Sequence, residues 1–352
     1  MKELLINKIN ELLKQEDITE KELCANLSKI VRNHEYKLYE SVSAPSMSSI
    51  FSKALEKLKN GQQNDNHIQT NFKNIDRIIK GLSFGELILV GGRPGMGQSV
   101  FMINMSLEIA LQVPVLYVTF DTNANLLINR FAGALTGMLP AKISFGSLSS
   151  EELAELGPLV DRMNQYPIYI NDDCRSNIGN LRALCIKQIK ENGVRCIFID
   201  YIQILSAYKF NQNRYAELNY LIKEIKEIAL EYNVCIIAGS MLSRAVEVRG
   251  GVKRPMLSDL RESGALEEYA DKVFFIYRPE YYEIYQDEDG NDTRGLMEVI
   301  IAKNNNGIIG TAKLMCNHYV SQLKDFDAEE ATYESKFNIS NKRLDDFDLP
   351  PF

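Results

Sequence analysis

The sequence predicts an α/β fold in which helices cover both faces of a mostly parallel, twisted β-sheet. Between residues 87 and 315, short apolar runs alternate with longer amphipathic segments, and this alternation is typical of parallel strands joined by crossover helices. The first apolar run, Leu87 to Val90, leads into Gly92-Arg93-Pro94-Gly95-Met96-Gly97-Gln98-Ser99. The glycine spacing of this turn is that of a phosphate-binding loop between a strand and a helix.

The individual elements follow from the apolar pattern. A helix is expected after the glycine-rich turn, at 99–111, and two crossover helices at 177–191 and 215–231. Buried strands are expected at 87–90, 115–120, 168–170, 196–199, 234–238, 273–276, 299–302 and 312–315.

The segments outside this core have a different character. Residues 1–45 have apolar residues at helical spacing and form a short helical appendage, whereas residues 46–69 contain an amphipathic helix and a polar linker. The apolar side of this helix could pack on its own domain or on a neighbouring subunit, and both alternatives remain open. The core spans 70–325, and the acidic tail 326–352 is expected to be disordered.

Composition limits the classes of function. The net charge of −7 and pI near 5.3 provide no global basic field, so any contact with nucleic acid must be local. The six cysteines are scattered without a CxxC pair, which indicates reduced thiols rather than zinc ligands. No segment has the unbroken apolar length of a membrane span, so we expect a cytoplasmic protein without membrane contact.

Two segments together predict a site for ATP, or another NTP, with Mg²⁺. Gly92, Gly95 and Gly97 allow backbone N–H groups to face phosphates, beside the positive end of the following helix. The apolar run 196–199 ends in Asp200, which would hold Mg²⁺ together with Ser99. Taken alone, the turn could be only a tight connection and Asp200 only a cap of its strand.

Position 98 weakens this prediction. A phosphate-binding loop normally carries a lysine there, whose charge follows the β- and γ-phosphates. The neutral amide of Gln98 can donate hydrogen bonds but cannot neutralise charge. We therefore expect the nucleotide to be bound weakly.

These segments resemble the RecA-like C-terminal motor domain of DnaB-type replicative hexameric DNA helicases, over roughly residues 46–325. The resemblance implies a P-loop NTPase fold, ATP-dependent helicase activity, single-stranded DNA as partner, a ring-shaped hexamer and a linker helix at 46–59 that docks on the adjacent subunit. It depends on the loop at 92–97, Asp200-Tyr201-Ile202-Gln203, Lys253-Arg254-Pro255, Ser258-Asp259-Leu260-Arg261-Glu262-Ser263-Gly264, Ile276-Tyr277-Arg278, Ile300-Ile301-Ala302-Lys303 and Asn306-Gly307.

By the same resemblance, four catalytic positions are substituted. Besides Gln98, Asp121 stands in place of the glutamate that polarises water, and Met241 in place of the glutamine that senses the γ-phosphate. Asn305 replaces the arginine that reaches into the neighbouring subunit's site. Because these groups act on different atoms of one transition state, we expect weak or absent hydrolysis.

Compensation and a second class of function remain alternatives. A cation could reach the phosphates from Arg130, which we count among the cofactor-binding residues, or from Arg244 or Lys303. The chain could instead be a non-catalytic regulatory or assembly partner that joins a mixed ring with another helicase. Residues 1–45 are too short for the helical collar domain that the family usually carries.

Two further segments suggest binding partners. The resemblance places Arg261, Glu262 and Gly264 in the loop that grips single-stranded DNA, with local charge added by Arg244, Arg249, Lys253 and Arg254. Arg261 and Glu262 could also form only a surface ion pair. The C-terminus is similar to the acidic tip of bacterial single-stranded-DNA-binding proteins, which implies shared protein partners, although an ordinary acidic tail is the alternative. This likeness depends on Asp345, Asp346, Phe347, Asp348, Pro351 and Phe352.

Overall fold

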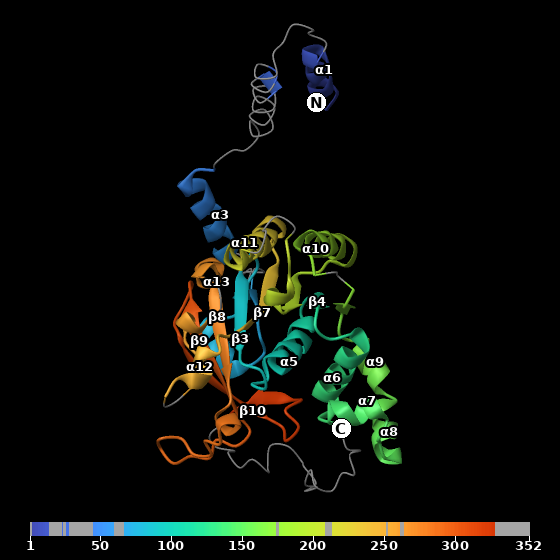
Figure 1. The fold of residues 1–352 in the computed structure, drawn as a ribbon, viewed down its shortest axis with the longest axis vertical. Coiled ribbons are helices and arrows are strands. Elements are labelled where there is room, and N and C mark those ends of the chain that lie inside the picture. The colour runs from blue at the N-terminus through green and yellow to red at the C-terminus, as the bar shows by residue number, and fades with distance from the viewer. Residues whose placement is uncertain are drawn as a thin grey trace. The chain divides into compact units, whose positions relative to one another are not determined.

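The computed structural model describes residues 2–13, 23, 26–27, 45–59, 67–173, 176–207, 213–250, 253–260 and 264–327. By internal contacts the chain divides into two units, 1–65 and 66–352. The first unit contains α1 (Lys2–Leu13) and α3 (Met47–Lys59), both drawn in blue in Figure 1. The predicted amphipathic helix is thus present as α3. Beyond position 327, the predicted tail with its acidic tip at 345–352 lies outside the described residues.

The second unit is built on a nine-stranded sheet with the order β11-β10-β9-β8-β3-β7-β6-β4-β5. In this order, neighbouring strands in the stretch β8-β3-β7-β6-β4-β5 run parallel, whereas those in the stretch β8-β9-β10-β11 run antiparallel. A separate two-stranded ribbon joins β1 (His67–Ile68) to β2 (Leu82–Ser83). The large sheet consists of β3 (Leu87–Gly92), β4 (Val115–Thr119), β5 (Ile168–Asn171), β6 (Cys196–Asp200), β7 (Cys235–Met241), β8 (Lys272–Tyr277), β9 (Leu296–Asn304), β10 (Gly310–Cys316) and β11 (Leu323–Asp325).

Helices cover both faces of this sheet, as predicted. Alternate residues of β3 point to opposite sides: Ile88 and Val90 belong to one apolar core, Leu87 and Leu89 to the other. The first core includes apolar residues of α5 and α6, and the second those of α10, α11 and α13. In Figure 1, α10 and α11 lie side by side. The helices are α4 (Lys73–Ile79), α5 (Gln98–Ala110), α6 (Ala124–Thr136), α7 (Pro140–Phe145), α8 (Ser150–Leu156), α9 (Leu159–Met163), α10 (Ile178–Asn192), α11 (Arg214–Tyr232), α12 (Ala245–Val248) and α13 (Gly264–Tyr269), with single 3₁₀ turns η1 (Ile202–Ile204), η2 (Leu257–Asp259) and η3 (Pro279–Tyr282).

All eight predicted strands are present. The strand–helix alternation, however, does not continue after β8, because β8, β9 and β10 are successive antiparallel strands without a crossover helix. In the described part of the chain, no helix has the length and apolar character needed to cross a bilayer. The four cysteines in the described part of the chain, Cys185, Cys196, Cys235 and Cys316, are buried free thiols.

Candidate nucleotide site

The glycine-rich turn connects β3 to α5 at the centre of the sheet. All six residues of β3 are buried between β7 and β8, so the start of the turn is fixed. Gly95 and Gly97 have φ angles of 82° and 88°, in the left-handed region that favours glycine. A Cβ at Gly97 would lie 2.7 Å from the Cε of Met297. The backbone therefore forms a tight turn that only glycine fits, at the N-terminus of a thirteen-residue helix.

A cavity of about 410 Å³ opens above this turn. It lies where the carboxyl ends of β3, β4, β6, β7 and β8 meet, the edge at which open parallel sheets bind their ligands. The structure gathers nine of the predicted site residues around it: Gly92, Gly95, Gly97, Gln98, Ser99, Asp121, Arg130, Asp200 and Met241.

Ser99 and Asp200, the two residues predicted to hold Mg²⁺, lie together at the cavity. The Ser99 hydroxyl donates a hydrogen bond to the Asp200 carboxylate, and the Tyr117 hydroxyl donates to its Oδ2 at 3.2 Å. Burial raises the pKa of Asp200, while these two hydrogen bonds and the charge of Arg130 oppose that shift. In the described residues no three His, Cys, Asp or Glu side chains cluster as metal ligands. A hydroxyl and one carboxylate nevertheless suit Mg²⁺, which keeps water and phosphate oxygens as its other ligands.

The side chain of Gln98 is folded back onto the sheet. Its Nε2 donates a hydrogen bond of 2.9 Å to the carbonyl of Val90. It is also enclosed by backbone, because a Cβ at Gly239 would lie 2.6 Å from Nε2 and one at Gly92 would lie 3.1 Å from the Cβ of Gln98. In this conformation the amide is hydrogen-bonded to β3 and packed against Gly239 of β7, so the contact of Gln98 with phosphate stays a prediction.

Gln203 holds the end of β7 beside the cavity. Its Oε1 accepts a hydrogen bond of 3.1 Å from the N–H of Met241, and its Nε2 donates to the Ser240 Oγ at 2.9 Å. The polar groups of this strand end are thereby satisfied by one side chain. The group that Met241 contributes to the cavity is a thioether, which is a weak acceptor.

Three arginines line the cavity, and only Arg130 was selected from the sequence. Arg93 pairs with Glu247 at 3.0 Å and donates to the carbonyl of Leu242 at 3.1 Å. Arg278 donates to the Gly95 carbonyl at 3.4 Å, and its buried Nε has no hydrogen-bond partner among the described residues. The sequence signals were position 93 within the turn and the segment 276–278, but neither showed where the side chains point.

Asn305 does not join the cavity. It follows β9, whose Asn304 pairs with Lys272 at the amino end of β8, and its N–H donates to the Asp271 carbonyl at 2.9 Å. The phosphate-binding turn follows the opposite, carboxyl end of β3. A side chain at position 305 therefore cannot act on the cavity of its own subunit.

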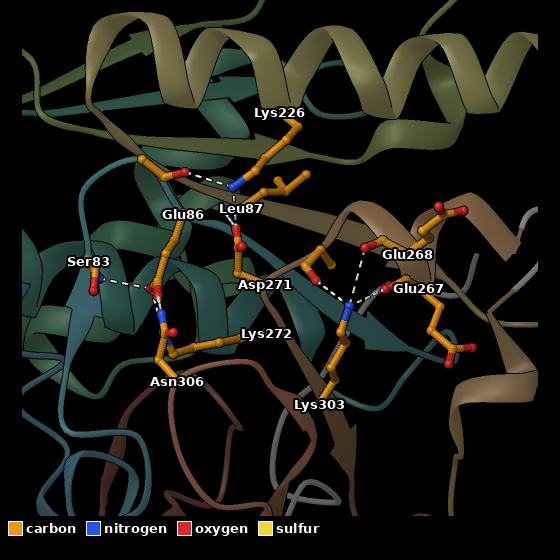
Figure 2. A network of polar contacts seen from close by, with 12 residues as sticks. Ser83, Glu86, Leu87, Lys226, Glu267, Glu268, Asp271, Lys272, Lys303 and Asn306 are labelled. Carbon is orange, nitrogen blue, oxygen red and sulfur yellow. Dashed lines mark hydrogen bonds and ion pairs between the residues drawn. The ribbon is translucent and has the colours of Figure 1, made fainter. Parts of the chain in front are cut away.

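Lys303 is also held away from the cavity. Its Nζ donates to the carbonyls of Glu267 and Ala270, each at 2.7 Å, near the C-terminus of α13. Figure 2 shows this side chain beside Glu267 and Glu268. A lysine is favourable at the negative end of a helix. Compensation by Lys303, one of the three alternatives, is therefore not available in this arrangement.

Only some of the residues predicted to bind DNA lie in the described part of the chain. Arg261 and Glu262 lie outside the described residues, and Gly264 begins α13. Arg249 pairs with Asp259, and Arg254 pairs with Glu298 at 2.7 Å. Their charges are therefore balanced within the domain, whereas Arg244 is exposed.

Comparisons with known proteins agree with this geometry. Residues 67–325 match the profile of a family described as the DnaB-like helicase C terminal domain. The chain is 32% identical over 300 residues to the replicative DNA helicase DnaC of Bacillus subtilis (strain 168), covering 84% of this chain and 62% of that protein. It is 31% identical over 300 residues to the replicative DNA helicase DnaB of Geobacillus stearothermophilus, with the same two shares. The chain thus spans about 62% of the length of these curated relatives.

Two solved structures share the fold. One, described as an ATPase domain, has a TM-score of 0.72 and 27% identity, covering 81% of this chain and 100% of that chain. A DnaB-like replicative helicase, described with its interactions with primase, has a TM-score of 0.71 and 25% identity, covering 93% of this chain and 77% of that chain. These matches confirm the predicted mostly parallel, RecA-like P-loop fold.

Proposed function

Because this chain belongs to the DnaB-like helicase C-terminal domain family, we propose that it binds nucleotide and single-stranded DNA but hydrolyses ATP weakly or not at all. One observation supports this most directly. The cavity keeps the phosphate-binding backbone and the Ser99–Asp200 pair, while Gln98 is bonded to the sheet. The groups that would bind phosphate and Mg²⁺ are retained, whereas the groups needed for hydrolysis are replaced.

The residues present fit a nucleotide with Mg²⁺. The turn at Gly95 and Gly97 and the N-terminus of α5 provide backbone N–H groups for phosphate. Ser99 and, through water, Asp200 would hold Mg²⁺, which neutralises phosphate charge when it is bound. Arg130, which forms no ion pair with another described residue, is the cation best placed to approach the phosphates.

Hydrolysis needs groups that this cavity lacks among the described residues. A carboxylate at 121 is one methylene shorter than a glutamate, which withdraws it by roughly 1.5 Å from an attacking water. The thioether of Met241 is a poor partner for a γ-phosphate. An arginine finger contributes on the order of 10³ to 10⁵ in rate, and position 305 is an asparagine.

The position of Asn305 supports assembly into a ring. A residue at the edge opposite the cavity can serve only the cavity of another subunit, as a head-to-tail interface requires. We propose a hexameric ring in the cytoplasm, with single-stranded DNA as a partner and α3 docked on the adjacent subunit. Binding to proteins that recognise the acidic tip, through residues 345–352, is part of the same proposal.

A regulatory role is the second candidate function. In a mixed ring, Asn305 would present an uncharged amide where a neighbouring subunit needs a cation. This chain would then slow an active helicase by occupying positions in its ring. Titration into a working helicase tests this role directly, since unchanged unwinding at equimolar protein would exclude it.

Steady-state ATP hydrolysis by the full chain, with and without single-stranded DNA, tests the main proposal. We expect turnover well below about 1 s⁻¹, the lower end of typical enzyme rates. Gln98→Lys alone should not restore it, because three other groups remain replaced. DNA-stimulated turnover of about 1 s⁻¹ or more that is lost in Ser99→Ala would contradict the proposal.

A further inference from the structure

The side chain of Gln98 closes the floor of the cavity between two strands. Its Nε2 donates to the Val90 carbonyl of β3 at 2.9 Å. On the β7 side it meets Gly239, where an added Cβ would lie 2.6 Å from Nε2. To face the cavity, the amide would have to leave both contacts, so in this arrangement position 98 offers no donor to a phosphate.

The backbone groups for the two inner phosphates of a nucleotide are intact. In phosphate-binding loops these phosphates are held by backbone N–H groups and by the following helix. Both are present here, since Gly95 and Gly97 hold the required backbone angles and α5 begins at Gln98. Arg278 adds a cation beside the loop at the Gly95 carbonyl.

Among the described residues, the side chains that would face a third phosphate are mostly uncharged or negative. In such loops the side chain at position 98 reaches the β- and γ-phosphates. Besides Gln98, the surroundings are the thioether of Met241 and the carboxylates of Asp121 and Asp200. Arg130 is the cation that opposes the mutual repulsion of these two carboxylates. A third phosphate would add negative charge where Arg130 already offsets the charge of Asp200.

We propose that this cavity is selective for a nucleoside diphosphate over the triphosphate, and that Gln98 and Met241 determine this selectivity. The inference rests on the proposed nucleotide binding and deepens it by naming the ligand. The diphosphate would stay bound as a structural ligand instead of being a product that is released. A bound nucleotide that does not change its state would give the subunit one fixed conformation in a ring.

Competition for a fluorescent ADP derivative on the full chain, in Mg²⁺ buffer, tests this selectivity. ADP is expected to displace the probe at a concentration at least about threefold lower than a non-hydrolysable ATP analogue. Gln98→Lys should improve the analogue's affinity about tenfold relative to ADP, because a charged donor then serves the third phosphate. An analogue that binds the native chain as tightly as ADP, or tighter, would overturn the inference.

Position 241 provides a second variant that avoids the packed floor. Met241→Gln restores a hydrogen-bonding side chain and should move the preference towards the analogue, whereas the similarly sized Met241→Leu should leave the ratio unchanged. Equal shifts with both substitutions would contradict a role for position 241 in selectivity. Binding of neither nucleotide to the native chain or to folded Gln98→Lys would instead refute nucleotide binding itself, so the two failures are distinguishable.

Discussion

Arg93 of the phosphate-binding turn forms an ion pair with Glu247 of α12, with Nε and Oε1 3.0 Å apart. The same Oε1 accepts a hydrogen bond from the Tyr282 hydroxyl at 3.2 Å, and burial next to Glu247 raises the pKa of Tyr282 to about 12. One carboxylate therefore ties the turn to α12 and η3. The conformation of the turn depends on elements far from it in sequence.

We expect Glu247→Gln to weaken nucleotide binding several-fold while the domain stays folded. The substitution removes the charge that orients Arg93, and a hydrogen bond to a charged group contributes about 1.5 to 3 kcal/mol. Isothermal titration with ADP and a thermal melt separate the two effects. Asp292→Asn is the matched control, because its pair with Arg294 is exposed, and unchanged ADP affinity in Glu247→Gln would contradict the prediction.

The buried ion pair between Lys272 and Glu86 leads to a prediction about stability. Lys272 is only 1% exposed. Glu86 also accepts hydrogen bonds from the Ser83 N–H and from Asn306 Nδ2, each at 2.9 Å, and Figure 2 shows these contacts. Lys272→Met leaves the carboxylate of Glu86 buried without its cation, so we expect a loss of about 3 to 5 kcal/mol in the free energy of unfolding. Urea denaturation measures this value.

An exposed pair on α11 serves as the control for Lys272→Met. Lys223 and Glu227 are 3.8 Å apart and largely exposed, so Lys223→Met should change the free energy of unfolding by less than about 1 kcal/mol. Similar losses for the two variants would mean that burial does not set the cost at Lys272.

The fold was more accessible to sequence reasoning than the site. The eight strands were found because each is a continuous apolar run in a sheet that is covered on both faces. β1, β2 and β11 have two or three residues, too few for a periodic signal. The cavity residues come from five strand ends, and their meeting follows from the topology of the parallel strands.

What sequence reasoning could not supply was the direction of individual side chains. Gln98 was known to lack a charge, but its bond to Val90 depends on the space left by Gly239 of a strand about 140 positions away. Lys303 was a candidate cation, yet the C-terminus of α13 holds it at the other edge of the sheet. Such outcomes depend on tertiary contacts that no local pattern encodes.

The charge of Asp200 predicts how stability depends on pH. Burial raises its pKa in the folded state, so folding binds protons and the free energy of unfolding falls as pH rises through that pKa. Asp200→Asn lacks this penalty. Its stability relative to the native chain should be greater at pH 7 and should lose that advantage below the pKa of an unfolded aspartate, near about 4.

Thermal melts from pH 3 to pH 8 measure this difference, with Asp289→Asn at an exposed position as a control. The same variant should lose the stabilisation that Mg²⁺ and ADP give to the native chain, because Asn cannot carry the charge that holds the metal. A lower melting temperature than the native chain at pH 7 would contradict the assignment of Asp200 as a group that burial destabilises.

Substitutions of Arg244 and Arg254 can separate an effect on DNA binding from an effect on stability. Arg244 is exposed, whereas Arg254 pairs with the mostly buried Glu298 at 2.7 Å. For Arg244→Gln we expect single-stranded DNA affinity to fall about three- to tenfold and the salt dependence of binding to decrease by roughly one counterion, with little effect on unfolding. Arg254→Gln should instead lower the free energy of unfolding, because Glu298 loses its cation. Fluorescence anisotropy with an oligothymidine at two salt concentrations measures DNA affinity, and urea denaturation measures the free energy of unfolding. A larger loss of DNA affinity in Arg254→Gln than in Arg244→Gln, at equal folded fraction, would reverse the roles assigned to the two arginines.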